Sequence, residues 1–178
     1  LETLAKLRQI VGLLKVTPAI ELAENVLQSG ESVVLYAHHL SVVDLLYRGL
    51  KDKYSVGIIQ GSVSQQERAH IVEKFQKGET QVMIITSAGG EGIDLYRASS
   101  VIFVEREWNS GKEMQAEARL HRIGQNNPVV ATYLVLTDTI DEKISKLIES
   151  KRSVFNDIIG LAQIETDIRE TILKELTK

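Results

Sequence analysis

The chain has 178 residues, which fits about one domain of the usual ~150 residues and leaves enough buried surface for a core. Its 43% hydrophobic and 25% charged residues exclude a disordered acidic chain and a fibrous repeat. The net charge is −3, so any contact with nucleic acid must come from individually placed groups. The absence of cysteine excludes disulfides and thiolate metal sites and favours an intracellular protein. No apolar run approaches the ~18 residues that cross a bilayer, so no membrane partner is expected.

The first half of the chain alternates helical and strand patterns. Apolar residues at helical spacing open the chain, and a second helix is expected to begin at the cap Thr17, with Pro18 in its first turn, and to end at Gly30. A strand, a helix and a second strand follow, and then a helix that opens with the capping box Ser64–Glu67 and stops at Gly78. These four segments are predicted at 32–37, 40–50, 55–59 and 64–78.

The second half continues the alternation. Strands are predicted at 81–86, 101–105 and 129–136. A helix is expected to begin at Asn109 or Ser110 and run to Gly124, and another is expected to open with the capping box Thr139–Glu142. The last stretch, 161–176, again has helical spacing. Strands that alternate with helices predict an α/β fold with a mostly parallel sheet flanked by helices on both faces.

A glycine-rich segment, TSAGGEGIDL (86–95), directly follows a predicted strand. Glycines allow a loop to approach a ligand closely, but a tight structural turn explains most such sequences. Asp94 could bond a sugar hydroxyl, or it could cap the turn. The pattern alone leaves both alternatives open.

A second informative segment is QAEARLHRIGQ (115–125), predicted to be helical. At 100° per residue, Gln115, Arg119 and Arg122 fall within about 40° of one another and share one helix face. This arrangement fits a solvated basic stripe and an anion-binding face equally well, because planar guanidinium groups suit phosphate oxygens.

Together these segments resemble a known family. TSAGGEGIDL, VIFVEREWN (101–109) and QAEARLHRIGQ are similar, in order and spacing, to the fifth and sixth motifs of superfamily-two helicases, and Trp108-Asn109 with HRIGQ resembles the Swi/Snf branch. The motifs that lie upstream in this family resemble VVLYAHHLSVVDLL (33–46) and GSVSQQERAHIVEKFQ (61–76). The residues of these two segments most resemble those of annealing helicases. The similarity extends from Leu7 to Lys151 and implies the second, C-terminal RecA-like lobe of an ATP-driven motor on double-stranded or forked DNA.

The resemblance also implies roles for individual residues. Arg122 corresponds to the arginine finger that stabilises charge on the γ-phosphate, and Arg119 to its companion. Gln115, Gly92 and Asp94 correspond to positions near the nucleotide. Residues that would contact DNA phosphates are Gly61, Ser62, Thr86 and Ser87, with Arg68 as a weaker candidate. The motif departs from its usual form at Ala118, where an acid is normal, and at Glu105, where aspartate is usual.

The first lobe of such a motor carries the phosphate loop and a DEAH-type motif, and neither GxxxxGK[ST] nor DExH occurs in these 178 residues. ATP is therefore expected to be hydrolysed only by the two-lobe protein, with Mg²⁺ held mainly by the first lobe, and the isolated piece is expected to be inactive. The first residue is Leu1 rather than Met, which favours an excised piece. The resemblance implies helices at 1–30, the lobe at 31–152, a helical extension at 153–178, and a location in the cytoplasm, nucleoid or nucleus.

Two other functions remain as alternatives. A degenerate lobe could serve only as a DNA- or protein-interaction module, although the presence of both Arg119 and Arg122 argues against that. A stand-alone nucleotide-binding domain is disfavoured by the missing phosphate loop. The residues His38 and His39 lack further ligands at metal spacing, so no metal site is expected, and Trp108 is expected to be partly buried.

Overall fold

The computed structural model describes residues 2–90, 92–108 and 110–155. The predicted helix at 161–176 and the candidate cap Asn109 lie outside this part of the chain. No helix among the described residues is long and apolar enough to cross a membrane. The helices are α1 (Glu2–Leu14), α2 (Val16–Gln28), α3 (Leu40–Leu50), α4 (Gln65–Lys77), α5 (Ser110–Ala118) and α6 (Ile140–Phe155), and the strands are β1 (Val33–Tyr36), β2 (Val56–Ile59), β3 (Val82–Ile85), β4 (Ser100–Phe103) and β5 (Val130–Tyr133).

The five strands form one sheet in the order β2-β3-β1-β4-β5, and every pairing is parallel. Val33, for example, pairs with Val82 on one side and Ser100 on the other. Because parallel strands need crossover helices, both faces of such a sheet are covered, as the sequence predicts. All carboxyl ends consequently lie at one edge of the sheet.

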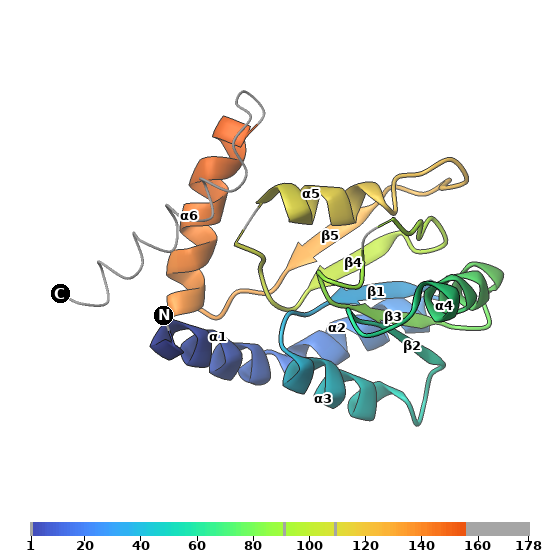
Figure 1. The fold of residues 1–178 in the computed structure, drawn as a ribbon, viewed down its shortest axis with the longest axis horizontal. Coiled ribbons are helices and arrows are strands. Elements are labelled where there is room, and N and C mark those ends of the chain that lie inside the picture. Colours follow the sequence, from blue (N-terminus) through green and yellow to red (C-terminus); the bar gives the residue numbers. More distant parts are fainter. Residues whose placement is uncertain (1, 91, 109, 156–178) are drawn as a thin grey trace.

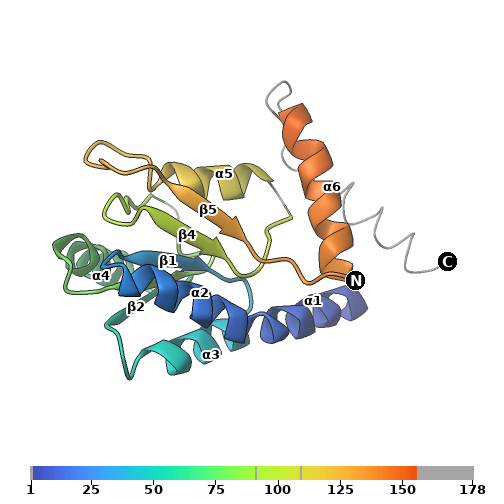
Figure 2. The ribbon, with the colours of Figure 1, turned by 180° about the vertical axis from the view of Figure 1, so that it is seen from behind.

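Alternate residues of the central strands feed two separate cores. Val33 and Leu35 of β1 point toward α2 and α3, where Leu46 and Leu50 are fully buried. Val34 and Tyr36 point toward α4 and α5, where Phe75 and Leu120 are fully buried. Figures 1 and 2 show these helix pairs on opposite faces of the sheet. Burial of each such side chain stabilises the fold by about 1.5–3 kcal/mol relative to exposure.

Helix α1 runs along the carboxyl edge at the β4–β5 end and contacts α6 there (Figure 1). Trp108, 7% exposed, is buried in the apolar cluster that joins α1 to α6, and the Arg8 guanidinium lies 4.4 Å above its ring centroid. Lys15, between α1 and α2, forms a buried ion pair of 2.8 Å with Asp141 and donates to the Leu134 carbonyl at 3.1 Å. These contacts cover one part of the carboxyl edge. In the open part of the edge, the loops after β2 and β3 carry the exposed residues Gly61, Ser62 and Ala88.

Helix α5 is fixed to the end of β4 by a buried ion pair. The Arg106 guanidinium bonds both carboxylate oxygens of Glu113, at 2.9 and 2.7 Å, and Glu113 is 0% exposed. Arg106 also pairs with Glu149 of α6 at 2.9 Å and lies 4.3 Å from the Tyr133 ring centroid. Arg106 is therefore unavailable to DNA, although a count of charges along the sequence includes it.

The capping box at Ser64 is confirmed. The Glu67 amide donates to the Ser64 hydroxyl at 3.3 Å, the Ser64 amide donates to the Glu67 carboxylate at 3.2 Å, and Gly78 ends α4 at φ +80°. The box predicted at Thr139 is only partly correct: the Thr139 hydroxyl accepts from the Asp141 amide, but the Glu142 carboxylate accepts from Asp138 rather than from Thr139. The Asp138 backbone, at φ +58°, turns its amide toward that carboxylate.

Two predicted helix ends are wrong. Helix α2 begins at Val16 with Lys15 before it, not at a Thr17 cap, because the buried Lys15 side chain holds the chain in a helical conformation between α1 and α2. Helix α5 ends at Ala118 rather than Gly124. The reason is that the Arg119 carbonyl accepts from the Leu95 amide at 3.0 Å and so does not continue the helical ladder.

Gly12 of α1 provides the space for Glu105. A Cβ at Gly12 would lie 2.5 Å from Glu105 Oε1 and 3.0 Å from Val42 Cγ2. The Glu105 carboxylate is 5% exposed and bound to backbone amides, so it cannot swing aside. This close approach requires glycine in the middle of a helix.

Gly12→Ala is therefore expected to lower the free energy of unfolding by about 1–3 kcal/mol through overpacking, although alanine is intrinsically the better helix former by about 1 kcal/mol. Urea unfolding followed by circular dichroism measures this. The control is Gly49→Ala in α3, whose Cβ would lie 2.3 Å from Cδ1 and 3.4 Å from Cγ1 of Ile20, the end of a flexible side chain that can rotate away. In a Glu105→Asp background the shorter carboxylate should remove part of the Gly12→Ala penalty. An equal penalty in both backgrounds would contradict the explanation.

Candidate nucleotide- and DNA-binding site

The loops after β1, β2 and β3 meet at the open part of the carboxyl edge. Gly89 packs so closely on the end of β2 that an added Cβ would lie 2.5 Å from the Ile59 carbonyl oxygen. Gly61 also packs closely, since an added Cβ there would lie 3.2 Å from the Ala88 Cβ. The loop 86–90 and the loop 60–62 therefore form one continuous surface, which explains why small residues are needed in both.

The residues assigned to DNA contacts by resemblance differ in accessibility. Gly61 and Ser62 are exposed, and the Ser62 hydroxyl accepts from the Gln60 side chain at 3.1 Å. Thr86 is 6% exposed, and its carbonyl accepts from the Gly89 and Gly90 amides at 2.9 and 3.1 Å. Thr86 thus shapes the glycine loop in this conformation, and the adjacent Ser87 is more accessible.

Arg119 lies at the centre of the edge. Its Nη1 donates to the Tyr36 hydroxyl at 3.0 Å, and the side chain is half-buried beside Gly90 and Gln115. Gln115, on α5, lines the same small cavity. The structure therefore brings Gln115 and Arg119 together as the sequence predicts.

Arg122 lies apart from them. Because α5 ends at Ala118, Arg119 and Arg122 both belong to the turns that follow it, so the predicted helix face shared by Gln115, Arg119 and Arg122 is wrong. Its Nε lies 3.2 Å from Asp94 Oδ1, with 56% and 55% of the two side chains exposed. An ion pair this exposed contributes little stability and leaves the guanidinium free to change partners.

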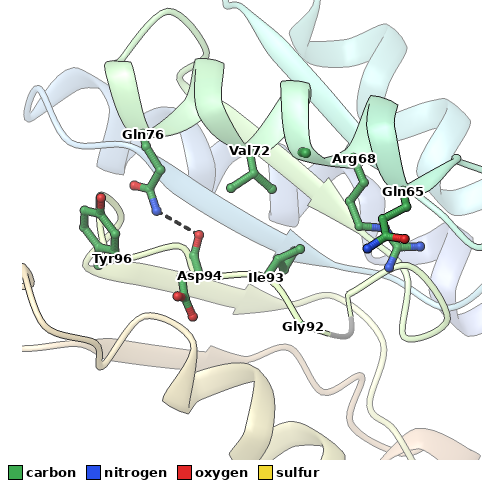
Figure 3. A pocket seen from close by; sticks show the side chains of 9 residues that line it. Gln65, Arg68, Val72, Gln76, Gly92, Ile93, Asp94 and Tyr96 are labelled. Atoms are coloured by element: carbon green, nitrogen blue, oxygen red, sulfur yellow. Dashed lines mark hydrogen bonds between the residues drawn. The ribbon is translucent and has the colours of Figure 1, made fainter.

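A groove of about 600 Å³ lies between α4 and the segment 92–96, as Figure 3 shows. Gln65 and Arg68 stand at one end, Gln76 and Tyr96 at the other, and Gln76 donates to the Asp94 carbonyl at 2.8 Å. The groove joins Arg68, predicted to contact DNA, to Gly92 and Asp94, predicted to lie near the nucleotide. Gly92 has φ +71° and is exposed, so this corner of the loop favours glycine.

Glu107 is a further acid of this site, and the sequence motifs do not indicate it. It lies 3.7 Å from His38 Nδ1 and lines the cavity that also contains Ser87, Lys112 and Arg119. Burial alone would raise the pKa of Glu107, but hydrogen bonds to His38 and Ser87 and the charge of Lys112 outweigh burial, and its pKa falls below the ordinary 4.5. Glu105 and Glu107 follow the buried strand β4 by two and four residues, and this alternation is the sequence signal for both.

Glu105 organises the loop after β1. Its Oε2 accepts from the backbone amides of His38 and His39 at 2.7 and 2.9 Å, and its Oε1 lies 2.5 Å from His39 Nδ1. His39 is the residue before α3, so the carboxylate also lies at the positive end of that helix. The His39 ring is therefore held by Glu105. Among the described residues, no three His, Cys, Asp or Glu side chains converge as a metal site would require.

Comparison with known proteins identifies the family and the fold. The family described as "Helicase conserved C-terminal domain" matches residues 15–124, which include the glycine loop and both arginines. The chain belongs to this family. Its resemblance to the Swi/Snf branch of superfamily two, and the RecA-like α/β fold that it implies, are confirmed by relatives and solved structures.

Three of them illustrate the relationship. The helicase C-terminal domain is 38% identical over 124 residues to the human DNA annealing helicase and endonuclease ZRANB3, covering 68% of this chain and 12% of that protein. It is 37% identical over 134 residues to the human lymphoid-specific helicase, covering 73% and 16%. The Sulfolobus solfataricus SWI2/SNF2 ATPase core in complex with dsDNA superposes with a TM-score of 0.74 at 29% identity, covering 92% of this chain and 38% of that one. The chain thus spans less than a fifth of the length of these curated relatives.

The Glu107 contacts predict a dependence of stability on acid. Since the pKa of Glu107 is lower in the folded than in the unfolded chain, the folded state binds fewer protons, and the resulting stabilisation is present above pH 4.5 and is lost as pH falls through the folded pKa. Glu107→Gln lacks this contribution. Urea unfolding at a series of pH values should show wild type losing its advantage over Glu107→Gln below pH 4.5. The exposed Glu21→Gln on α2 is the control, and a difference between wild type and Glu107→Gln that stays constant with pH would contradict the assignment.

Proposed function

We propose that this chain is the C-terminal motor lobe of an ATP-dependent translocase on double-stranded DNA, and that it supplies the arginine finger and part of the DNA track. The observation that carries the proposal is the state of its two arginines at the open edge. Arg119 is held by a neutral hydroxyl, and Arg122 by one exposed carboxylate. Among the residues that the structure describes, neither guanidinium is buried in an ion pair with an acid, in contrast to Arg106.

In this proposal the γ-phosphate of ATP enters from the first lobe and meets Arg122, which leaves Asp94 to pair with the phosphate oxygens. Arg119 contacts the phosphates beside it, and Gln115 orients the edge of α5. Gly92 and Asp94 lie near the ribose. Water attacks the γ-phosphorus, the bond to the ADP oxygen breaks, and the developing charge on the phosphoryl oxygens is stabilised by the guanidinium groups. We assign Mg²⁺ to the first lobe.

The DNA track in this proposal follows the continuous surface of the 60–62 and 86–90 loops. Exposed Gly61 and Ser62 offer a backbone amide and a hydroxyl to phosphates, and Ser87 adds a second hydroxyl. Arg68 extends the track onto α4 and into the groove that reaches Asp94. Such contacts read phosphates rather than bases, so binding should be independent of sequence and sensitive to salt.

Closing of the two lobes on ATP and their opening after hydrolysis would move these loops along the duplex. We place residues 31–152 in the lobe proper and 1–30 in helices packed on it. The first lobe of the same parent protein is the required partner. The DNA substrate places the parent inside the cell.

Arg122→Ala in the full-length two-lobe parent is expected to lower kcat for DNA-stimulated ATP hydrolysis at least about 100-fold, because the γ-phosphate loses its charge-stabilising group. Arg122→Lys keeps the charge but lacks the planar guanidinium, so its kcat should lie between those of wild type and Arg122→Ala. Phosphate release is the measurement. The matched control is Arg48→Ala on α3, an arginine whose exposed ion pair with Asp44 lies away from the edge. Full activity of Arg122→Ala would instead favour a lobe that serves only for interactions.

Arg68→Ala in the parent is expected to weaken duplex binding equally for unrelated sequences and to reduce the dependence of log K on log salt by about one unit. Fluorescence anisotropy across a salt series measures both quantities. Lys53→Ala, which removes an exposed cation paired with Glu24, serves as the control. An unchanged salt slope for Arg68→Ala would exclude Arg68 from the track.

A further inference from the structure

The position of Arg119 is defined by one aromatic hydroxyl. The Tyr36 hydroxyl accepts from Arg119 Nη1 at 3.0 Å, and Tyr36 itself is 5% exposed at the end of β1. Its ring stacks on Phe103 at 5.2 Å between centroids, and Phe103 stacks on Tyr133 at 4.6 Å. Three rings on three neighbouring strands thus hold the hydroxyl in a fixed place.

Gly90 leaves the space that the Arg119 guanidinium occupies. An added Cβ there would lie 2.7 Å from Arg119 Nη1, 3.0 Å from Ile85 Cγ2 and 3.3 Å from the Tyr36 hydroxyl. Any side chain at this buried position would push the guanidinium or the hydroxyl out of place. The reason for glycine here is space rather than backbone conformation, since a positive φ is recorded at Gly92 but not at Gly90.

The Tyr36 hydroxyl differs from a carboxylate acceptor in its charge. Burial raises the pKa of Tyr36, so the phenol stays neutral while its oxygen accepts a hydrogen bond from the guanidinium group. A neutral acceptor orients Arg119 without offsetting its positive charge, whereas an acid would partly neutralise it. The residue before Arg119 is Ala118, so the adjacent position supplies no carboxylate.

We propose that Tyr36 is a positioning residue for Arg119, which it holds against Gly90 in a fixed position to contact a nucleotide phosphate. This inference rests on the proposed function in one respect, that Arg119 contacts the nucleotide. Tyr36 lies in the segment 33–46, which resembles an upstream helicase motif, and the inference gives this residue a role of its own.

Tyr36→Phe in the full-length parent removes one oxygen atom and keeps the ring stack. The expected result is a fall of about tenfold in kcat for DNA-stimulated ATP hydrolysis, as for loss of a hydrogen bond to a charged group. The KM for ATP and the affinity for DNA should change less than threefold. Tyr47→Phe on α3, away from Arg119, is the matched control and should retain wild-type kcat.

The decisive comparison adds Tyr36→Phe to Arg119→Ala. If Tyr36 acts through Arg119, the double variant has the same kcat as Arg119→Ala alone. A further tenfold loss in the double variant, or a wild-type kcat for Tyr36→Phe alone, overturns the proposal. If Arg119→Ala itself retains wild-type kcat, the role of Arg119 in the proposed function fails instead, and the two failures are distinguished.

Discussion

The carboxylate of Glu105 holds together the edge on which the site is built. From the end of β4 it accepts the two backbone amides that lead into α3 and the ring of His39, and its other side fills the space left by Gly12 of α1. Hydrogen bonds from backbone amides to an ionised acceptor are among the stronger ones in proteins. Three segments far apart in the chain therefore depend on one buried carboxylate. Glu107, two residues further along, lines the cavity that contains Arg119.

The two arginines of the edge are held in different ways, and this difference suits different tasks. Arg119 has a buried, rigid acceptor and a glycine wall, so its position is set before any ligand arrives. Arg122 is more than half exposed and paired with an exposed acid, so it can exchange that acid for a phosphate at little cost. The edge therefore combines a guanidinium in a fixed position, that of Arg119, with one that can change its partner, that of Arg122.

Much of the fold follows from sequence patterns, whereas several details depend on distant contacts. The Ser64 capping box and the glycine stop at Gly78 are local hydrogen-bonding patterns, so they could be predicted and are confirmed. The end of α5 could not be predicted, because the Leu95 amide, 24 positions before Arg119 in the chain, takes the carbonyl that would have continued the helix. The partnership of Tyr36 with Arg119 joins residues 83 positions apart and leaves no periodic signal.

The Arg106 cluster joins three elements with contacts of unequal strength. Its bond to Glu113 is fully buried, and separating such a pair would cost about 3–5 kcal/mol, whereas Glu149 is 52% exposed and its ion pair contributes about 0–1 kcal/mol. Under mechanical strain the weaker contact yields first. The start of α6 remains held by the Lys15–Asp141 ion pair and by Ile144 in the apolar cluster. A load applied along α6 would therefore loosen its contact at Glu149 before it disturbed α5 and the arginine edge.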